Sequence, residues 1–128
     1  MEHAKSFRDL EVYKFARELS KEIYEKSKSF PKEEMFSLTD QIRRSSRSVG
    51  AQIAEAWAKR RYEKNFISKL TDSDGEQQET QHWIETAHSC AYLSLTQTED
   101  LLKRYASVGR MLNSMINKAY KFCADSHH

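Results

Sequence analysis

Two Glu-x-x-His pairs are the residues of this sequence whose spacing most resembles a metal centre. Glu79 with His82, and Glu85 with His88, have the spacing at which four-helix di-iron proteins present their ligands. Such a site needs a second pair on another helix, and no other helical segment carries one. Glu79 and His82 also lie away from the apolar stripe through Ile84. We therefore interpret both pairs as surface residues and expect no metal and no cofactor.

Three further patterns could do chemistry, and each fails on detail. Residues 72–75, Asp-Ser-Asp-Gly, begin like a calcium loop, but the glycine comes too early and the following ligand positions do not fit. The serines within residues 45–48 lack the Gly-x-Ser-x-Gly turn of a hydrolase nucleophile. Cys90 and Cys123 form no Cys-x-x-Cys motif, which is more typical of a reducing compartment than of zinc or a disulfide. We predict no catalytic residues and no enzyme activity.

The basic side chains of residues 37–62 are the chemistry that remains. That segment has a net charge of +4, whereas residues 63–95 have a net charge of −4. Clustered cations can bind the phosphates of nucleic acid, and Tyr62 beside them could stack on a base. The predicted nucleic-acid-binding residues are Arg43, Arg44, Arg47, Lys59, Arg60 and Arg61. The alternative interpretation is that the two segments are adjacent helices whose opposite charges complement each other at their solvated edges.

These cations must be positioned by a helix over residues 38–61, which separates into two faces at helical period. One face is a core seam made of Leu38, Ile42, Ser45, Val49, Ile53 and Ala56. The second face, centred roughly 140° around the helix, combines arginines with small residues. A glycine in a helix interior costs about 1 kcal/mol relative to alanine, so a close neighbour is expected there, either a packing partner or a nucleic-acid backbone. The predicted oligomer interface is Gly50, Ala54 and Ala58.

The remaining segments are also amphipathic, and few residues in the chain favour turns. With three Gly and one Pro among 128 residues, long helices are expected rather than a sheet-rich fold. We predict an all-α, antiparallel up-down-up-down four-helix bundle that forms a single domain over residues 1–128. Its approximate helices are residues 7–29, 37–61, 62–95 and 98–123. Ser6 with Asp9 should cap the first helix, and residues 96–99 should form a capping box for the last.

The third helix has the least regular pattern. Its expected inward positions are Phe66, Leu70, Ile84, Ala87, Ala91 and Leu95. Between them, from residue 71 through 81, every residue except Gly75 is polar or charged. We predict a bend near Gly75 and a polar layer in the core around it.

No segment of the chain is typical of a membrane protein or a secreted one. No run approaches the roughly 18 apolar residues that a membrane span requires, and the first ten residues lack the apolar core of a signal peptide. We expect a cytoplasmic protein. We assign no function to His127 and His128.

The order of several short motifs is informative as well. Phe-Arg-Asp-Leu at residues 7–10 is followed by Phe30-Pro31, then by QIRRSSRSVGAQIAEAW at residues 41–57 and by EQQETQ at residues 76–81. Together they span nearly the whole chain and resemble the four-helix bundle family encoded within intervening sequences of bacterial 23S ribosomal RNA genes. That family is similar in fold to the accessory variability determinant of diversity-generating retroelements, a pentameric barrel that binds nucleic acid and a reverse transcriptase. The resemblance implies a homopentamer with no established enzymatic activity.

Two functions therefore remain open. The first is a ring-forming, non-enzymatic protein that binds structured RNA or DNA through the six cations. Closure of a ring would repeat the modest charge of each chain around the assembly, which would give a multivalent band of cations. The second is a scaffold that docks a partner protein, such as a reverse transcriptase, without direct nucleic-acid binding. Salt separates the two, since phosphate contacts weaken steeply with salt and a packed protein interface does not.

Overall fold

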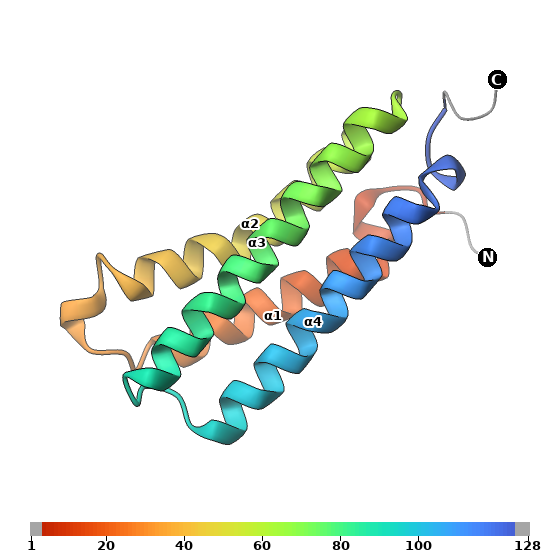
Figure 1. The fold of residues 1–128 in the computed structure, drawn as a ribbon. Coiled ribbons are helices and arrows are strands. Elements are labelled where there is room, and N and C mark those ends of the chain that lie inside the picture. The colour runs from red at the N-terminus through yellow and green to blue at the C-terminus, as the bar shows by residue number, and fades with distance from the viewer. Residues whose placement is uncertain (1–3, 125–128) are drawn as a thin grey trace.

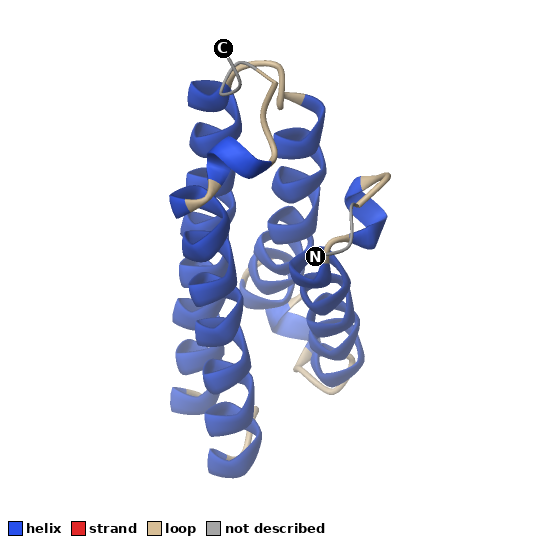
Figure 2. Ribbon diagram, turned by 90° about the vertical axis from the view of Figure 1, so that its right-hand side faces the viewer, coloured by secondary structure: helices blue, strands red, loops and turns tan. Residues whose placement is uncertain are grey.

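Four long helices make up most of the computed structural model, which describes residues 4–124 (Figure 1). They are α1 (Glu11–Ser27), α2 (Leu38–Ala58), α3 (Glu63–Ser89) and α4 (Leu95–Asn117). Three short 3-10 turns accompany them, η1 (Phe7–Asp9), η2 (Lys32–Glu34) and η3 (Ala119–Lys121). Each helix runs antiparallel to the one before it (Figure 1), and α1 and α3 each pack against both α2 and α4. The predicted all-α up-down-up-down bundle is confirmed, with no strand among the described residues (Figure 2).

The core is formed by one stripe from each helix. All six residues of the predicted α2 seam are buried, and so are the predicted inward positions of α1, namely Val12, Ala16, Leu19 and Ile23. Full burial of a Leu, Ile or Phe side chain contributes about 1.5–3 kcal/mol to folding. Hydrophobic burial along these four stripes therefore determines which face of each helix is exposed and can bind another molecule.

A polar layer crosses this core between α2 and α3, as the sequence predicts. The Ser73 hydroxyl donates to the carbonyl oxygen of Val49 at 2.8 Å, and the Thr80 hydroxyl donates to Ser45 Oγ at 2.9 Å. Gln77, between them on α3, is also buried. Helix α3 continues through Gly75, whose missing side chain faces open space.

All four helices are shorter than predicted, because the connections between them take up more residues than expected. The capping box of Ser6 and Asp9 exists, but it caps η1, and α1 begins only at Glu11 after an extended Leu10. At the other end of the bundle, Ser94 caps α4 with Gln97. The predicted box at residues 96–99 is therefore wrong, since those residues already lie inside α4.

The α3–α4 connection also corrects the predicted core. Helix α3 ends at Ser89, and Ala91 adopts a left-handed backbone with φ of 64°. The Ala91 amide donates to the His88 carbonyl oxygen and the Tyr92 amide donates to the Ala87 carbonyl oxygen, both at 2.9 Å, which is the Schellman arrangement of a helix C-terminus. This reversal leaves Ala91 exposed and Leu95 59 % exposed, so their predicted inward positions are wrong.

An ion network joins α1 to α4. Arg104 contacts Asp100 at 3.0 Å and Glu18 at 3.7 Å, and it also pairs with Glu22. The hydrogen bond from Arg104 holds the pKa of the Glu22 carboxyl below its ordinary value, against an opposing effect of burial. The network therefore anchors α1 to α4.

The two ends of the bundle carry different connections. At one end, the Tyr92 hydroxyl donates to Glu34 Oε2 at 2.9 Å and so joins the α3–α4 connection to η2. At the other end, the Ala124 amide donates to the Arg60 carbonyl oxygen at 3.1 Å, which joins the chain after η3 to the α2–α3 turn. We refer to them as the η2 end and the Arg60 end (Figure 1).

Candidate nucleic-acid interface

The six predicted cations lie in three separate places. Arg43 and Arg47 face α1, where their guanidinium carbons lie 4.7 Å and 5.4 Å from the centre of the Tyr24 ring. Arg43 Nε also donates to Ser27 Oγ at 2.8 Å. These contacts fix two cations beside Tyr24, a residue that is 37 % exposed.

Arg44 points to the other side of α2. It pairs with Glu76 at 3.5 Å and with Glu79, both on α3. The Trp83 indole, which donates to Glu79 Oε2 at 3.0 Å, and the Arg44 guanidinium hold the pKa of the Glu79 carboxyl below its ordinary value, although burial opposes them. Arg44 therefore belongs to the contact between the basic and acidic helices, as the alternative interpretation of the charge pattern predicts.

The cluster of Lys59, Arg60 and Arg61 lies at the Arg60 end. Arg60 Nε donates to the Trp57 carbonyl oxygen at 2.9 Å, and its guanidinium carbon lies 3.6 Å from the centre of the Trp57 ring. Arg61 lies 5.8 Å from the ring centre of Tyr62. Because a helix rises about 1.5 Å per residue, this cluster is roughly 24 Å along α2 from Arg43. The six cations do not form one continuous stripe.

An open groove of about 1050 Å³ runs between α1 and α2 beside Arg47. Small side chains line its base, including Ala16, Ala51 and Ala54. Cations from both helices and from η1 line its sides and the adjoining surface. We define the α1–α2 basic surface as Arg8, Arg17, Lys21, Tyr24, Arg43 and Arg47.

The charges of the α1–α2 basic surface are available for binding. Within residues 4–124, none of its five cations forms an ion pair with a carboxylate. Arg17 donates to the Tyr13 hydroxyl at 3.1 Å, which holds it along the groove. Two other charges line the groove but are already paired, Lys14 with Glu11 at 3.5 Å and Glu18 with Arg104. The surface is therefore basic even though the whole chain is nearly neutral.

Four of these residues were missed by the sequence prediction because residues 1–36 have no net charge: Arg8 on η1, and Arg17, Lys21 and Tyr24 on α1. The three on α1 share a recognisable pattern. The signal that could have found them is their spacing. Arg17 and Lys21 are four residues apart, and Tyr24 follows three residues later, so all three fall on one face of α1. The acidic residues that cancel their charge lie largely on other faces.

Gly50 has a close neighbour, but it belongs to the same chain. Gly50 is buried, and a Cβ built on it would lie 3.6 Å from Cε1 of Tyr13. Its predicted outward position is therefore wrong, since α1 covers it. Ala54 is half-buried beside the groove and Ala58 is exposed, so these two remain accessible to another molecule.

The Glu-x-x-His pairs show no metal-site geometry. Glu79 is engaged by Arg44 and Trp83, and His88 Nδ1 lies 3.1 Å from the Leu93 carbonyl oxygen. Among the described residues, no three His, Cys, Asp or Glu side chains are grouped closely enough to hold a metal ion. Over the same residues, no helix has the length and apolar character needed to cross a membrane.

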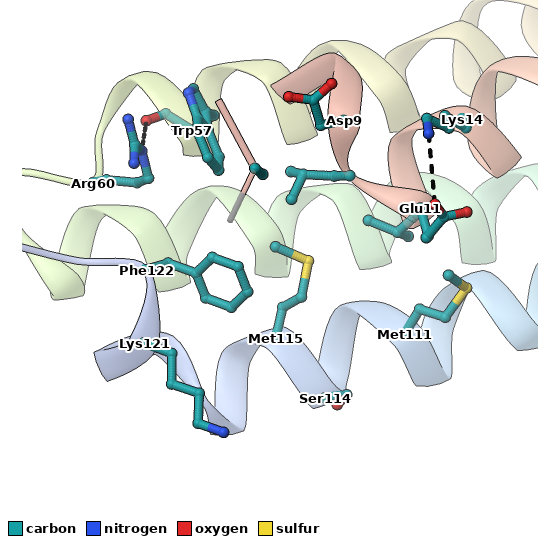
Figure 3. Close-up of a pocket in the computed structure, with 13 residues that line it drawn as sticks. Asp9, Glu11, Lys14, Trp57, Arg60, Met111, Ser114, Met115, Lys121 and Phe122 are labelled. Atoms are coloured by element: carbon teal, nitrogen blue, oxygen red, sulfur yellow. Dashed lines mark hydrogen bonds and ion pairs between the residues drawn. The ribbon is translucent and has the colours of Figure 1, made fainter. Parts of the chain in front are cut away.

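A second cavity, of about 710 Å³, lies at the Arg60 end between the start of α1, the end of α2 and the end of α4 (Figure 3). We call it the Trp57 groove. Trp57, Met115 and Phe122 face it, while Arg60, Lys121 and Asp9 lie along its rim (Figure 3). Its lining combines Trp, Met and Phe side chains with charged ones of both signs, whereas most charged residues of the α1–α2 groove are cations.

Comparisons with known proteins agree with this fold. A family model described as 23S rRNA-intervening sequence protein matches residues 8–114. A crystal structure of a protein with unknown function from the S23 ribosomal protein family of Bacteroides thetaiotaomicron VPI-5482 is similar, with a TM-score of 0.74 and 29 % sequence identity. That similarity covers 83 % of this chain and 95 % of the other. No curated protein matches the sequence.

Proposed function

The chain belongs to the 23S rRNA-intervening sequence protein family, and from this premise we propose that it is a cytoplasmic, non-enzymatic, oligomeric bundle that binds structured nucleic acid. The observation that carries the proposal is the α1–α2 basic surface, where cations without a carboxylate partner line the groove between two helices and two of the surface's arginines, Arg43 and Arg47, lie against the ring of Tyr24. This moves the predicted interface from the second helix alone to the seam between α1 and α2.

Each part of the α1–α2 basic surface suits a different part of a nucleic acid. Arginine guanidinium groups form paired hydrogen bonds with phosphate oxygens. Tyr24 offers a ring on which a splayed base can stack, and stacking contributes about 1–3 kcal/mol per base. The small side chains at the base of the groove let a sugar-phosphate backbone approach α2 closely. Because the contacts are mainly to backbone and ring faces, we propose recognition of shape rather than of sequence.

Self-assembly would strengthen this binding. We propose a homopentamer, by analogy with the accessory variability determinant of diversity-generating retroelements. Each chain has a net charge of only +2, so repeated copies of the basic surface are needed to hold one nucleic acid at several points. Ala54 and Ala58, which stay accessible, are the part of the predicted interface that a second copy can still reach.

A second candidate function is a scaffold that docks a partner protein, such as a reverse transcriptase, without touching nucleic acid. The Trp57 groove favours it, because grooves lined by Trp and Met are typical of protein-binding surfaces. The two candidates differ in which groove matters and in the response to salt.

The test is a charge reversal, Arg17→Glu with Arg47→Glu, assayed by fluorescence anisotropy on a labelled hairpin RNA and on a labelled duplex DNA. Both residues are exposed, so the helical circular dichroism signal should not change. We expect binding to be lost at low salt. The matched control is Lys103→Glu with Arg110→Glu, which changes the charge equally on exposed residues of α4 and should bind nearly as well as the original protein. No binding by the original protein would leave the scaffold as the better account, and equal loss in both variants would show that binding follows total charge rather than the α1–α2 basic surface.

A further inference from the structure

A second cationic site lies at the Arg60 end, apart from the α1–α2 basic surface. A shallow pocket of about 290 Å³ is lined there by Arg60, Arg61, Lys121, Phe122, Cys123 and Ala124. Among the described residues, three cations and no carboxylate line this pocket. We call it the Arg61 pocket. Charges of one sign around a small pocket favour a ligand of the opposite sign, so the pocket suits an anion.

Two segments that are far apart in the sequence build the Arg61 pocket. The Ala124 amide donates to the Arg60 carbonyl oxygen at 3.1 Å, which joins the chain after η3 to the α2–α3 turn. The Phe122 ring stacks on that of Phe66 in α3, with ring centres 5.6 Å apart. These contacts hold η3 against the α2–α3 turn, so little conformational freedom is lost when a ligand binds.

The cations of the Arg61 pocket lie beside aromatic rings rather than beside carboxylates. The Arg61 guanidinium carbon is 5.8 Å from the ring centre of Tyr62, and Lys121 Nζ is 6.0 Å from the ring centre of Tyr120. Within residues 4–124, none of the pocket's three cations forms an ion pair with a carboxylate. Their charges are therefore available to a ligand.

Two acidic residues line the adjoining Trp57 groove, but both are engaged by other groups. Glu11 pairs with Lys14 at 3.5 Å (Figure 3). Asp9 Oδ2 accepts from two backbone amides just before η1, at 2.8 and 3.2 Å. Neither acid therefore neutralises a cation of the Arg61 pocket.

Two tyrosine rings beside the pocket are open to solvent. Tyr62 and Tyr120 are each 52 % exposed. Ring faces bind unpaired bases by stacking, while neighbouring cations hold the phosphates of the same strand. A duplex presents no unpaired base, and the pocket is much smaller than the groove of about 1050 Å³ between α1 and α2. These features favour a single strand as the ligand.

A membrane surface is a poorer match for this end of the bundle. Proteins that lie on a membrane bury an apolar face at the lipid boundary. Apart from Tyr62 and Tyr120, no large apolar side chain is exposed at the Arg60 end among the described residues. The combination of cations and tyrosines therefore favours nucleic acid over lipid.

We propose that the Arg61 pocket and its two tyrosines bind a single-stranded tail of the nucleic acid whose structured part lies on the α1–α2 basic surface. The Arg61 pocket lies roughly 24 Å along α2 from Arg43, a distance that a strand of several nucleotides can span. The ligand class is then a duplex or hairpin with a single-stranded tail, rather than a blunt duplex. This inference rests on the proposed nucleic-acid binding and deepens it.

The first test compares a labelled blunt duplex DNA with the same duplex carrying a thymidine tail of about ten nucleotides, by fluorescence anisotropy at several salt concentrations. For the original protein, the tail should raise the affinity. It should also steepen the slope of log affinity against log salt concentration by about 2, because three contacts to a single strand contribute about −0.7 each. In Arg61→Ala with Lys121→Ala, one contact remains, so the extra slope should fall to about 0.7. Both residues are exposed, so the variant should fold.

The matched control is Lys103→Ala with Arg110→Ala, which removes one lysine and one arginine from exposed positions of α4 and should keep the full effect of the tail. If the original protein binds the blunt duplex but gains nothing from the tail, the Arg61 pocket does not bind single strands, although the proposed function would stand. If the original protein binds neither DNA, both ideas are refuted. If the Arg61 and Lys121 variant keeps the tail effect but no longer binds vesicles of phosphatidylserine, the pocket serves a lipid surface, and the proposal is overturned.

The second test asks whether the tyrosine rings stack on bases. Tyr62→Leu with Tyr120→Leu keeps every cation but removes both rings, and it should bind the tailed duplex about 5-fold or more weakly than the original protein. Tyr62→Phe with Tyr120→Phe keeps the rings and should bind like the original. A tail of abasic nucleotides should bind all three proteins equally. If the leucine variant binds the thymidine tail as well as the phenylalanine variant does, stacking is refuted.

Discussion

The salt dependence of nucleic-acid binding is the most quantitative consequence of the α1–α2 basic surface. Each phosphate that a cation neutralises on duplex DNA contributes about −0.9 to the slope of log affinity against log salt concentration. If all five cations of the surface contact phosphates, the slope is about −4.5, and the affinity falls about 500-fold between roughly 50 and 200 mM salt. The five cations are Arg8, Arg17, Lys21, Arg43 and Arg47.

Neutralising two of these cations gives a specific expected change. For Arg17→Ala with Arg47→Ala, three contacts remain, so the slope should become about −2.7 and the fall in affinity about 40-fold over the same range. The measurement is fluorescence anisotropy with a labelled duplex at four or more salt concentrations. Because the slope depends on the number of phosphates contacted, a partly misfolded variant would lower the bound fraction without changing the slope.

The control for this experiment is Lys103→Ala with Arg110→Ala, which removes the same charge from exposed positions of α4. Its slope should stay at about −4.5. The reasoning is refuted if both variants change the slope equally, because binding would then follow total charge. It is also refuted if neither does, because the phosphates would lie elsewhere.

Three other predictions concern folding. A Cβ on Gly75 would meet nothing within 4 Å, so Gly75→Ala should stabilise the protein by about 1 kcal/mol. A Cβ on Gly109 would lie 2.7 Å from Nε2 of the buried Gln77. Gly109→Ala should therefore be less stable than Gly75→Ala by about 1–3 kcal/mol in urea unfolding. Ala91→Gly should raise the free energy of unfolding by about 1 kcal/mol, because its positive φ strains an L-residue; an unchanged thermal midpoint would contradict this. The pKa of Glu22 is lowered in the folded protein, so its ion pair stabilises the fold at pH values above the ordinary carboxyl pKa. This stability is lost as the pH falls through the folded pKa. Glu22→Gln should therefore reduce the difference in free energy of unfolding between pH 7 and pH 3.

The sequence was sufficient to predict the helices, the α2 seam and the polar layer, because each depends on the period of residues along one segment. The charge pattern was harder to interpret. Arg43 and Arg44 are neighbours in the sequence, but they face different helices, and one is neutralised by Glu79 while the other is not. The cations of α1 were hidden because acidic residues on other faces of the same helix cancel them in any count along the chain. Pairing between segments, rather than composition, decides which charges remain available.

Local conformation explains the other differences. Ala91 shows no sequence signal for a left-handed backbone, because glycine usually occupies that position at a helix end. The pattern of apolar residues therefore continued the third helix too far. Gly50 was correctly associated with a close neighbour, but periodicity alone could not show that the neighbour is Tyr13 of the same chain.

The polar layer between α2 and α3 has a consequence for how the bundle avoids alternative structures. Apolar stripes alone tolerate an axial slip of one helix past another, because each turn of about 5.4 Å presents a similar surface. A slip here would separate Ser73 from Val49 and Thr80 from Ser45. Thr80 would keep its bond to the Glu76 carbonyl oxygen, but the buried Ser73 hydroxyl would lose its partner, which costs about 1–3 kcal/mol. The hydrogen bonds of this layer therefore favour one axial register of α2 against α3. Apolar replacements at the same positions would preserve burial while allowing several registers to compete.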